Sequence, residues 1–426
     1  MLLSLCSAFA VLLCSPVSGQ EFPAASSKKG LQVQMLDDAL ALGVKHATLN
    51  VNLSSFAVPA NAKNSKDVAT YQWKHDGREF RFRKSVVDDF DRKIAKLSRN
   101  DVLVYLILLV YRSADPAINE VLCHPKYDSA APNRLSAFNT VTEDGQQWLA
   151  ALTEFMADRW TPRLGETETR PRVVGYIVGN EVNSHWFWSN RGSVTMPEFA
   201  KDYHAAVRTV HRAVRKTAAW PRVYVSLEHH WNIRFAGGNG MQAFPGRPFL
   251  EELSRLVKAE GDFDWHVAFH PYPENLRNPR FWKDRSATDA DDSPRITFRN
   301  LQVLARFLER PEMKFKGEPR RVILSEQGFD TPAGDDGETV QAAAYCYAYR
   351  KVASMKNIDA FILHRHVDHK YEGGLRLGLW SRKPDSVSSP DRKKKIYDCF
   401  KAADQDDWED AFRFALPIVN LTSWEE

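Results

Sequence analysis

Short apolar segments alternate along the chain with longer segments whose apolar residues recur at helical spacing. Residues 102–110 form the most apolar segment, and residues 173–178 combine β-branched and aromatic side chains without a polar face. Uninterrupted apolar runs of this length are typical of strands buried on both faces. Between them, apolar residues from Trp148 to Trp160 keep the spacing of an amphipathic helix.

The same alternation continues along the chain. We expect strands at residues 30–34, 46–53, 102–110, 173–178, 223–227, 263–269, 322–326 and 360–363. Helices are expected at residues 36–42, 86–97, 148–160, 195–214, 296–308 and 341–352. Eight strands, each followed by a helix or a segment compatible with one, favour a single (β/α)8 barrel over a doubly wound sheet.

Local signals mark some element boundaries. Residues 71–83 alternate about Asp76-Gly77, which predicts a hairpin. Ser85-x-x-Asp88 and Thr195-x-x-Glu198 both have the pattern of a helix N-terminal cap.

Long irregular segments follow strands, whereas the connections from helix back to strand are mostly short. The long segments are residues 54–84, 112–141, 229–246, 271–295 and 366–392. Their position predicts that the C-terminal face of the barrel carries the functional site.

The first residues have the composition of a secretory signal peptide. Residues 1–20 carry no charged side chain, are apolar from Leu2 to Leu13 and end in small residues. The positively charged N-terminal region that is typical of signal peptides is missing. We therefore expect a signal peptide at 1–19, a linker at 20–29, the barrel at 30–403 and a C-terminal extension at 404–426. The predicted location is secreted or periplasmic, without a membrane span.

Charge and cysteine content narrow the function further. A net charge of +4 spread over 426 residues does not indicate nucleic-acid binding. Without the leader, Cys123, Cys346 and Cys399 remain, an odd number without CxxC spacing. Neither a disulfide framework nor a cysteine zinc site is expected. Each of the three cysteines is expected to be a buried thiol, and a single disulfide bridge remains an open alternative.

Two glutamates stand at the ends of predicted strands. Glu181 follows the strand at 173–178, and Glu326 ends the strand at 322–326. If these are strands 4 and 7 of a barrel, the two carboxyl groups face each other across its mouth. Glycoside hydrolysis needs such a pair, one to protonate the leaving oxygen and one to attack or to activate water.

Short motifs around these glutamates resemble the clan of retaining (β/α)8-barrel glycosidases that includes cellulase-like and β-xylosidase-like enzymes. The motifs are Gly179-Asn180-Glu181, Ser325-Glu326 and His270-Pro271-Tyr272. The resemblance implies that Glu181 is the acid/base and Glu326 the nucleophile. It also implies that Asn180 contacts the sugar 2-hydroxyl and that Tyr272 hydrogen-bonds the nucleophile.

The resemblance covers roughly half of the chain, from strand 4 to strand 8. The tryptophan usual on strand 8 of the clan is replaced by His364-Arg365-His366-Val367-Asp368-His369. Over the whole chain, the sequence is most similar to secreted bacterial barrel proteins of unassigned function, so no substrate is implied.

Other polar and aromatic residues near strand ends are candidates for substrate binding. Trp186, Trp188, Trp231 and Trp380 could stack on sugar faces. The basic segment after strand 8 could bind a carboxylate or sulfate on an acidic or sulfated glycan. The full set of predicted substrate-binding residues is Asn180, His185, Trp186, Trp188, His229, His230, Trp231, His270, Tyr272, His364, Arg365 and His366.

Two alternatives remain open. A metal-dependent barrel hydrolase could use His364-x-His366 and His229-His230, but amidohydrolase-type barrels carry His-x-His after strand 1, where this chain has Asn50-Val51-Asn52. A barrel that binds glycan without cleaving it is the second alternative. We predict a glycoside hydrolase with a carbohydrate substrate and with neither a metal nor an organic cofactor.

Overall fold

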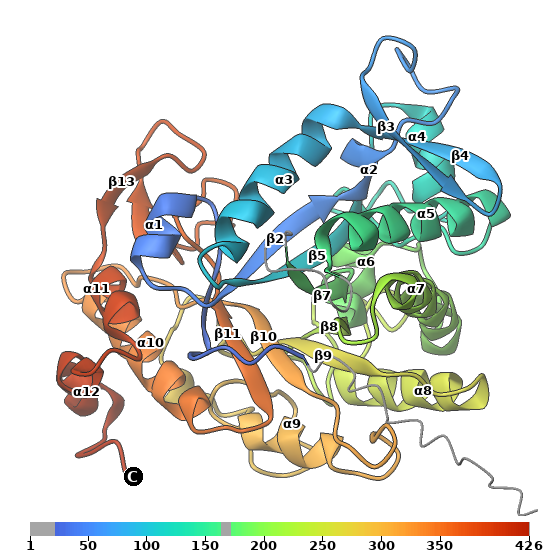
Figure 1. Ribbon diagram of the computed structural model, residues 1–426. Helices are drawn as coiled ribbons and strands as arrows, with labels where there is room; N and C mark the ends of the chain where they lie inside the picture. Colours follow the sequence, from blue (N-terminus) through green and yellow to red (C-terminus); the bar gives the residue numbers. More distant parts are fainter. Residues whose placement is uncertain (1–21, 163–171, 426) are drawn as a thin grey trace, which may run out of the picture.

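The computed structural model describes residues 22–162 and 172–425, so the expected signal peptide at 1–19 lies outside the described residues. Eight parallel strands in the described part form a closed barrel (Figure 1). They are β1 (Lys29–Gln32), β2 (His46–Asn52), β5 (Leu103–Tyr111), β7 (Val173–Val178), β8 (Arg222–Glu228), β9 (Trp265–His270), β10 (Val322–Gln327) and β11 (Ile358–Leu363). β2 pairs with both β1 and β5, and β1 pairs with β11, which closes the ring. The predicted (β/α)8 barrel is confirmed.

Helices surround the strands and bury the outer face of the barrel (Figure 1). The helices are α1 (Leu36–Ala41), α3 (Lys84–Ser98), α5 (Glu143–Trp160), α7 (Met196–Thr217), α8 (Gly246–Ala259), α9 (Leu301–Leu308), α10 (Gly337–Ala353) and α11 (Lys395–Ala402). A second, smaller apolar cluster fills the inside of the barrel and includes Tyr105, Ile177 and Tyr224. The interior is therefore a packed core, and only the strand ends are free to build a site.

Shorter elements lie mostly in the long segments that follow strands. They are α2 (Leu53–Phe56), the hairpin β3 (Thr70–His75) and β4 (Arg78–Arg83), α4 (Pro116–Leu122), β6 (Leu135–Ser136), α6 (His185–Trp188) and the pair β12 (Trp380–Arg382) and β13 (Pro390–Lys393). The predicted hairpin is confirmed, with Asp76 and Gly77 both at positive φ in the turn.

The two predicted helix caps have different outcomes. Thr195 and Glu198 form a capping box at the start of α7, as predicted. Ser85 does not cap α3, because β4 runs directly into the helix and Ser85 lies inside its first turn. The helix predicted at 296–308 starts only at Leu301, because the backbone N–H of Ile296 donates to His229 O (2.9 Å) and keeps that segment extended.

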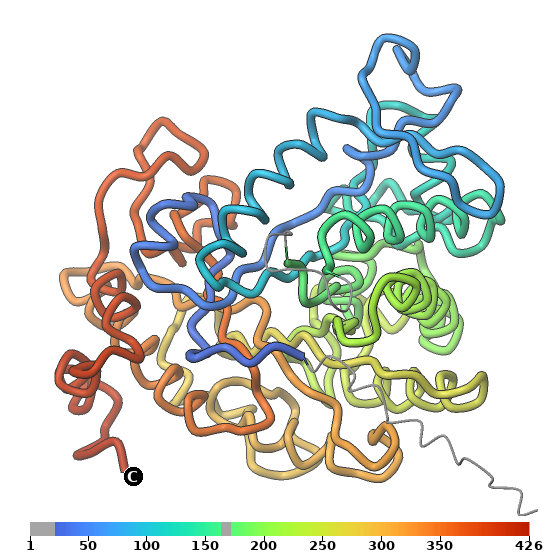
Figure 2. The backbone as a smooth tube through the Cα atoms, viewed as in Figure 1, coloured from blue at the N-terminus to red at the C-terminus, as the bar shows by residue number. Residues whose placement is uncertain are grey.

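Both ends of the described chain pack against the barrel. The N-terminal segment carries β1, which pairs with β11, and the helices α12 (Trp408–Phe412) and α13 (Leu416–Val419) lie at the other end of the chain (Figure 2). Lys28 Nζ donates to Val352 O at 2.8 Å at the end of α10. Trp408 and Phe412 contact Tyr349 and Tyr345 of α10, with ring centroids 6.0 and 6.2 Å apart.

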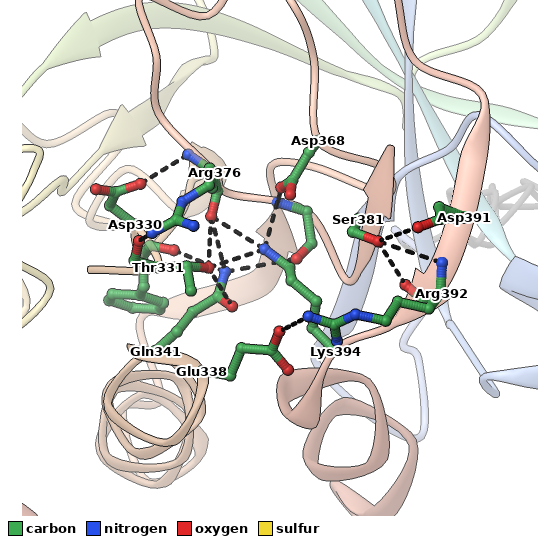
Figure 3. A network of polar contacts seen from close by, with 12 residues as sticks. Asp330, Thr331, Glu338, Gln341, Asp368, Arg376, Ser381, Asp391, Arg392 and Lys394 are labelled. Atoms are coloured by element: carbon green, nitrogen blue, oxygen red, sulfur yellow. Dashed lines mark hydrogen bonds and ion pairs between the residues drawn. The ribbon is translucent and has the colours of Figure 1, made fainter. Parts of the chain in front are cut away.

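A buried lysine ties the long segment after β11 to the barrel (Figure 3). Lys394 is 3% exposed, and its Nζ donates to Asp368 Oδ1 (3.0 Å), Thr331 Oγ1 (2.9 Å) and Arg376 O (3.1 Å). Gln341 of α10 donates to Phe329 O (2.9 Å) and Arg376 O (3.2 Å) from the same side. Burial lowers the pKa of Lys394, against the opposing charge of Asp368.

We predict that Lys394→Met lowers the free energy of unfolding by about 3–5 kcal/mol, because Asp368 is left buried without its counter-charge. Urea denaturation measures this loss. Lys93→Met is the matched control: Lys93 pairs with Asp89 at 2.7 Å but is 41% exposed, so its loss should cost less than about 1 kcal/mol. Equal losses in both variants would contradict the anchoring role of Lys394.

Candidate active site

A sharp turn after β7 places Glu181 at the mouth of the barrel. Gly179 has φ +76°, a left-handed conformation that favours glycine, and Glu181 itself has φ +42°. The backbone N–H of Glu181 donates to Ser226 Oγ of β8 at 3.0 Å, which fixes the turn to the neighbouring strand. A non-glycine residue held in this region is typical of functional sites.

Glu326, the second candidate, lies near the end of β10 on the other side of the mouth. Tyr272 follows β9, and its hydroxyl donates to Glu326 Oε1 at 3.2 Å, the contact that the family resemblance implied. Burial and the negative charge of Glu326 hold the pKa of Tyr272 well above its usual value. Tyr272 is therefore a neutral donor to the carboxylate.

His270, the last residue of β9, lies between the two glutamates. Its Nδ1 is 2.9 Å from Glu181 Oε1, and its Nε2 is 3.0 Å from Ser325 Oγ. One side-chain oxygen from each glutamate and a ring nitrogen of His270 all lie within 4.8 Å of one another. The barrel thus brings together two carboxyl groups 145 residues apart in the sequence.

The pKa values of Glu181 and of its partner His270 are both raised. Burial raises the pKa of Glu181, and the nearby Glu326 and Glu228 carboxylates add to the rise, while His270 opposes it. For His270, burial disfavours the charged ring, but the hydrogen bond to Glu181 and the surrounding carboxylates outweigh it and raise its pKa. A proton is therefore retained at the Glu181–His270 pair, which suits a general acid.

A buried network behind Glu181 holds the loops that follow β7, β8 and β9. Glu228 accepts from Asn183 Nδ2 (2.6 Å) and Ser184 Oγ (3.0 Å) on one oxygen, and from His230 N (2.9 Å) and Nδ1 (2.5 Å) on the other. Although burial opposes ionisation, the hydrogen bonds and the charge of His230 lower the pKa of Glu228 to about 2. Glu228 is an ionised structural group.

The predicted substrate contacts of His229 and His230 need correction in this light. His230 is buried against Glu228, and the Nδ1 of His229 donates to the backbone oxygen of Tyr272 at 3.1 Å. Burial lowers the pKa of His229 to about 3, so the ring is neutral. Both residues fix the loops that carry the site.

Three other predicted substrate-binding residues have buried side chains that contact the protein itself. His185 stacks between Phe199 and Phe244, with ring centroids 4.5 and 5.0 Å away. Trp231 is fully buried edge-on against Phe307 at 4.9 Å. His366 is also fully buried, and its Nε2 lies 2.8 Å from Asp38 Oδ2.

Trp380, a further stacking candidate, is also directed away from the mouth. Its Nε1 donates to Asp38 Oδ2 at 2.9 Å, and its ring meets that of Tyr397 edge-on at 5.6 Å. It therefore packs against α11.

The remaining predicted residues lie near the strand ends, and all of them except the buried His364 stay partly accessible. Asn180 is half-buried beside Glu181, and Trp188 packs on the apolar cluster inside the barrel. The indole N–H of Trp186 donates to Asp128 Oδ2 at 2.9 Å. His364 and Arg365, at the end of β11, both contact the carboxylate of Glu372.

Three residues of the mouth were not predicted. Tyr111 ends β5 and is 37% exposed; partial burial and then the charge of Glu326 raise its pKa. Glu372, in the segment after β11, adds to the raised pKa of Tyr272. Gln32 ends β1 and contacts His364 Nδ1. Their positions at or after strand ends were the available signal.

The three cysteines of the described chain, Cys123, Cys346 and Cys399, are buried and unpaired. The prediction of buried thiols is confirmed, and the single bridge left open in the sequence is not formed. Burial raises the pKa of the Cys123 thiol to about 11, so it is not a reactive thiolate.

Two residue groups have spacing that would suit a metal: Glu228 with His229 and His230, and Glu181 with His270 and Glu326. In the first group, each oxygen of Glu228 already accepts two hydrogen bonds, so a metal would have to displace them. The second group is the carboxylate pair itself. Amidohydrolases carry His-x-His after the first strand, but residues 50–52 end the second strand of this barrel. The first strand ends at Gln32, and the residues that follow it, Val33 and Gln34, are not histidine either.

A model for a family described as a family of unknown function (DUF5722) matches residues 21–426. No curated protein matches the sequence. No helix of the described residues is both long and apolar enough to cross a membrane.

Solved structures of glycoside hydrolases share the fold. A family 39 glycoside hydrolase from Bacteroides cellulosilyticus WH2 is 14% identical with a TM-score of 0.53, covering 86% of this chain and 59% of its own. This chain thus spans less than two thirds of that protein. A β-glucosidase from Pyrococcus furiosus is 13% identical with a TM-score of 0.54, over 90% of this chain and 86% of its own. The barrel is therefore glycosidase-like in fold.

We predict that zinc gives no stabilisation through the group of Glu228, His229 and His230, because Glu228 is saturated by hydrogen bonds. Thermal unfolding with and without Zn²⁺ checks this, since a site at a hundredfold excess of metal over Kd would add ~2.7 kcal/mol. A zinc-dependent rise in Tm that is lost in Glu228→Gln would contradict it and favour a metal-dependent hydrolase.

Proposed function

We propose that this chain, which belongs to the family of unknown function DUF5722, is a retaining glycoside hydrolase that acts on an oligo- or polysaccharide. The observation that carries the proposal is the pair of carboxyl groups at the mouth of the barrel, with one oxygen of Glu181 and one of Glu326 within 4.8 Å. Retaining enzymes hold their two carboxyl groups about 5–5.5 Å apart, whereas inverting enzymes leave about 6.5–9.5 Å for a water molecule.

The environment of each glutamate supports its role. Glu181, with its raised pKa, donates a proton to the glycosidic oxygen as the bond to the anomeric carbon breaks. Glu326 attacks that carbon and forms a glycosyl ester, while the hydroxyl of Tyr272 orients the attacking carboxylate. Glu181, now ionised, takes a proton from water, which cleaves the ester and restores both groups.

Contacts around the site indicate the charge of the glycan that could be the substrate. Three basic residues after β11 are paired within the protein: Arg365 with Glu372, His366 with Asp38 and Lys394 with Asp368. These pairs reduce the positive charge that the three residues offer to an acidic or sulfated glycan, the substrate suggested by the sequence. They favour a neutral glycan. The apolar leader supports a secreted or periplasmic site of action.

The test is a screen of the purified protein on neutral, uronic and sulfated polysaccharides, with new reducing ends as the readout. We expect hydrolysis of a neutral glycan by the wild type and none by the Glu181→Gln, Glu326→Gln double variant. Equal binding by both proteins without cleavage by either would instead support a glycan-binding barrel. Equal cleavage by both would contradict the assigned residues.

The pH dependence of kcat/KM tests the role of His270. Its hydrogen bond and charge lower the pKa of Glu181 against the effect of burial, so His270→Gln should raise that pKa. The basic limb of the profile reports loss of the acid's proton and should move to higher pH. The maximal rate should fall, because Glu181 loses its orienting partner.

Ser325→Ala is the control, because it removes the partner of His270 Nε2 and leaves Glu181 bonded to Nδ1. Its basic limb should move less than that of His270→Gln. A downward shift of the basic limb in His270→Gln would contradict the assignment of Glu181 as the acid.

A further inference from the structure

A groove of about 400 Å³ begins at the ends of β1 and β2 and continues over the rim of the barrel to α1 and α3. Gln32 and the exposed Asn50 line its inner part and bond each other at 3.3 Å. Leu36 of α1 and Phe90 of α3 line its outer part. Its volume is within the range of small-ligand sites, about 300–1,000 Å³.

The groove adjoins the carboxylate pair through a short series of contacts. Gln32 contacts His364 Nδ1, and the other ring nitrogen of His364 lies 3.2 Å from Glu372 Oε1. β11, which ends before His364, pairs with β1 on one side and with β10, which carries Glu326, on the other. A chain with one unit at the glutamates can therefore extend into the groove.

Polar atoms without partners line this groove. Two residues of the groove lining, Thr48 and Arg365, each carry a buried polar atom, Oγ1 and Nε, that has no hydrogen-bond partner among the described residues. Thr48 is fully buried. A buried polar atom without a partner is costly, and a ligand hydroxyl would satisfy it.

The charges of the groove point to a neutral ligand. Its two cationic side chains are already paired, Lys93 with Asp89 at 2.7 Å and Arg365 with Glu372. Among the described residues, no acidic side chain lines it. Side-chain amides and hydroxyls beside Leu36 and Phe90 match the hydroxyl groups and apolar C–H faces of uncharged sugars.

We propose that this groove binds the sugar units of a neutral oligosaccharide chain beyond the unit held between the two glutamates. The inference rests on the proposed function and extends it, since it makes the substrate a chain rather than a disaccharide.

Binding to the inactive Glu181→Gln, Glu326→Gln protein tests the groove separately from catalysis. The probes are xylo-, cello- and manno-oligosaccharides of increasing length and an oligogalacturonide series, with Kd from calorimetry. We expect the Kd of one neutral series to fall at least about tenfold from the disaccharide to longer chains, a difference of ~1.4 kcal/mol.

Adding Ser388→Trp to the inactive protein fills the groove from the segment between β12 and β13, where Ser388 lines it. This change should remove the gain with length and leave disaccharide binding unchanged. Ser389→Trp is the matched control, because Ser389 is exposed and next in sequence but outside the groove lining, and it should keep the gain.

The outcomes separate this inference from the proposed function. A gain with length that survives Ser388→Trp, a gain only for the oligogalacturonides, or no binding at any length would overturn the groove assignment. Length-dependent binding sensitive to Ser388→Trp would support the groove even if the wild type cleaved no glycan. Cleavage without such sensitivity would leave the enzyme proposal intact and reject the groove.

Discussion

Two carboxyl groups within 4.8 Å of each other repel when both are ionised, unless neighbouring groups stabilise the two charges. The rest of the site depends on the groups that reduce this repulsion. His270 lies between the glutamates, bonded to Glu181, and Tyr272 donates to Glu326. Glu181 is left as the group that retains a proton, and Glu326 accepts a hydrogen bond. These different neighbours support the different roles that we propose for the two glutamates.

The neighbours are themselves held by a second buried carboxylate. Glu228 fixes the turn after β7 through Asn183 and Ser184, and it fixes the start of the next loop through His230. His229 then bonds the backbone of Tyr272. Glu228 and His229 together thus link the loops after three successive strands, and these loops carry Glu181 and Tyr272. Precise placement of reacting groups requires such support.

The fold could be predicted because its signal is repeated along the chain. Each buried strand is an apolar run. A misplaced boundary, such as the start of the helix that begins at Leu301, does not change the number of strands and helices. Glu181 and Glu326 could be found because strand ends in a barrel share one face. The direction of each side chain could not be predicted from the sequence. His185 and Trp231 also follow strands, yet neighbouring aromatic rings bury them. Glu372 was missed because it lies in a long segment without periodicity.

The most direct test of the central claim is to trap the glycosyl ester with an activated 2-deoxy-2-fluoro glycoside of the sugar that the screen identifies, followed by mass spectrometry of peptides. The account predicts one sugar per chain, attached to the peptide that contains Glu326, and no adduct in Glu326→Gln. Attachment at Glu181, or turnover of the natural glycan with inversion of the anomeric centre, would contradict it.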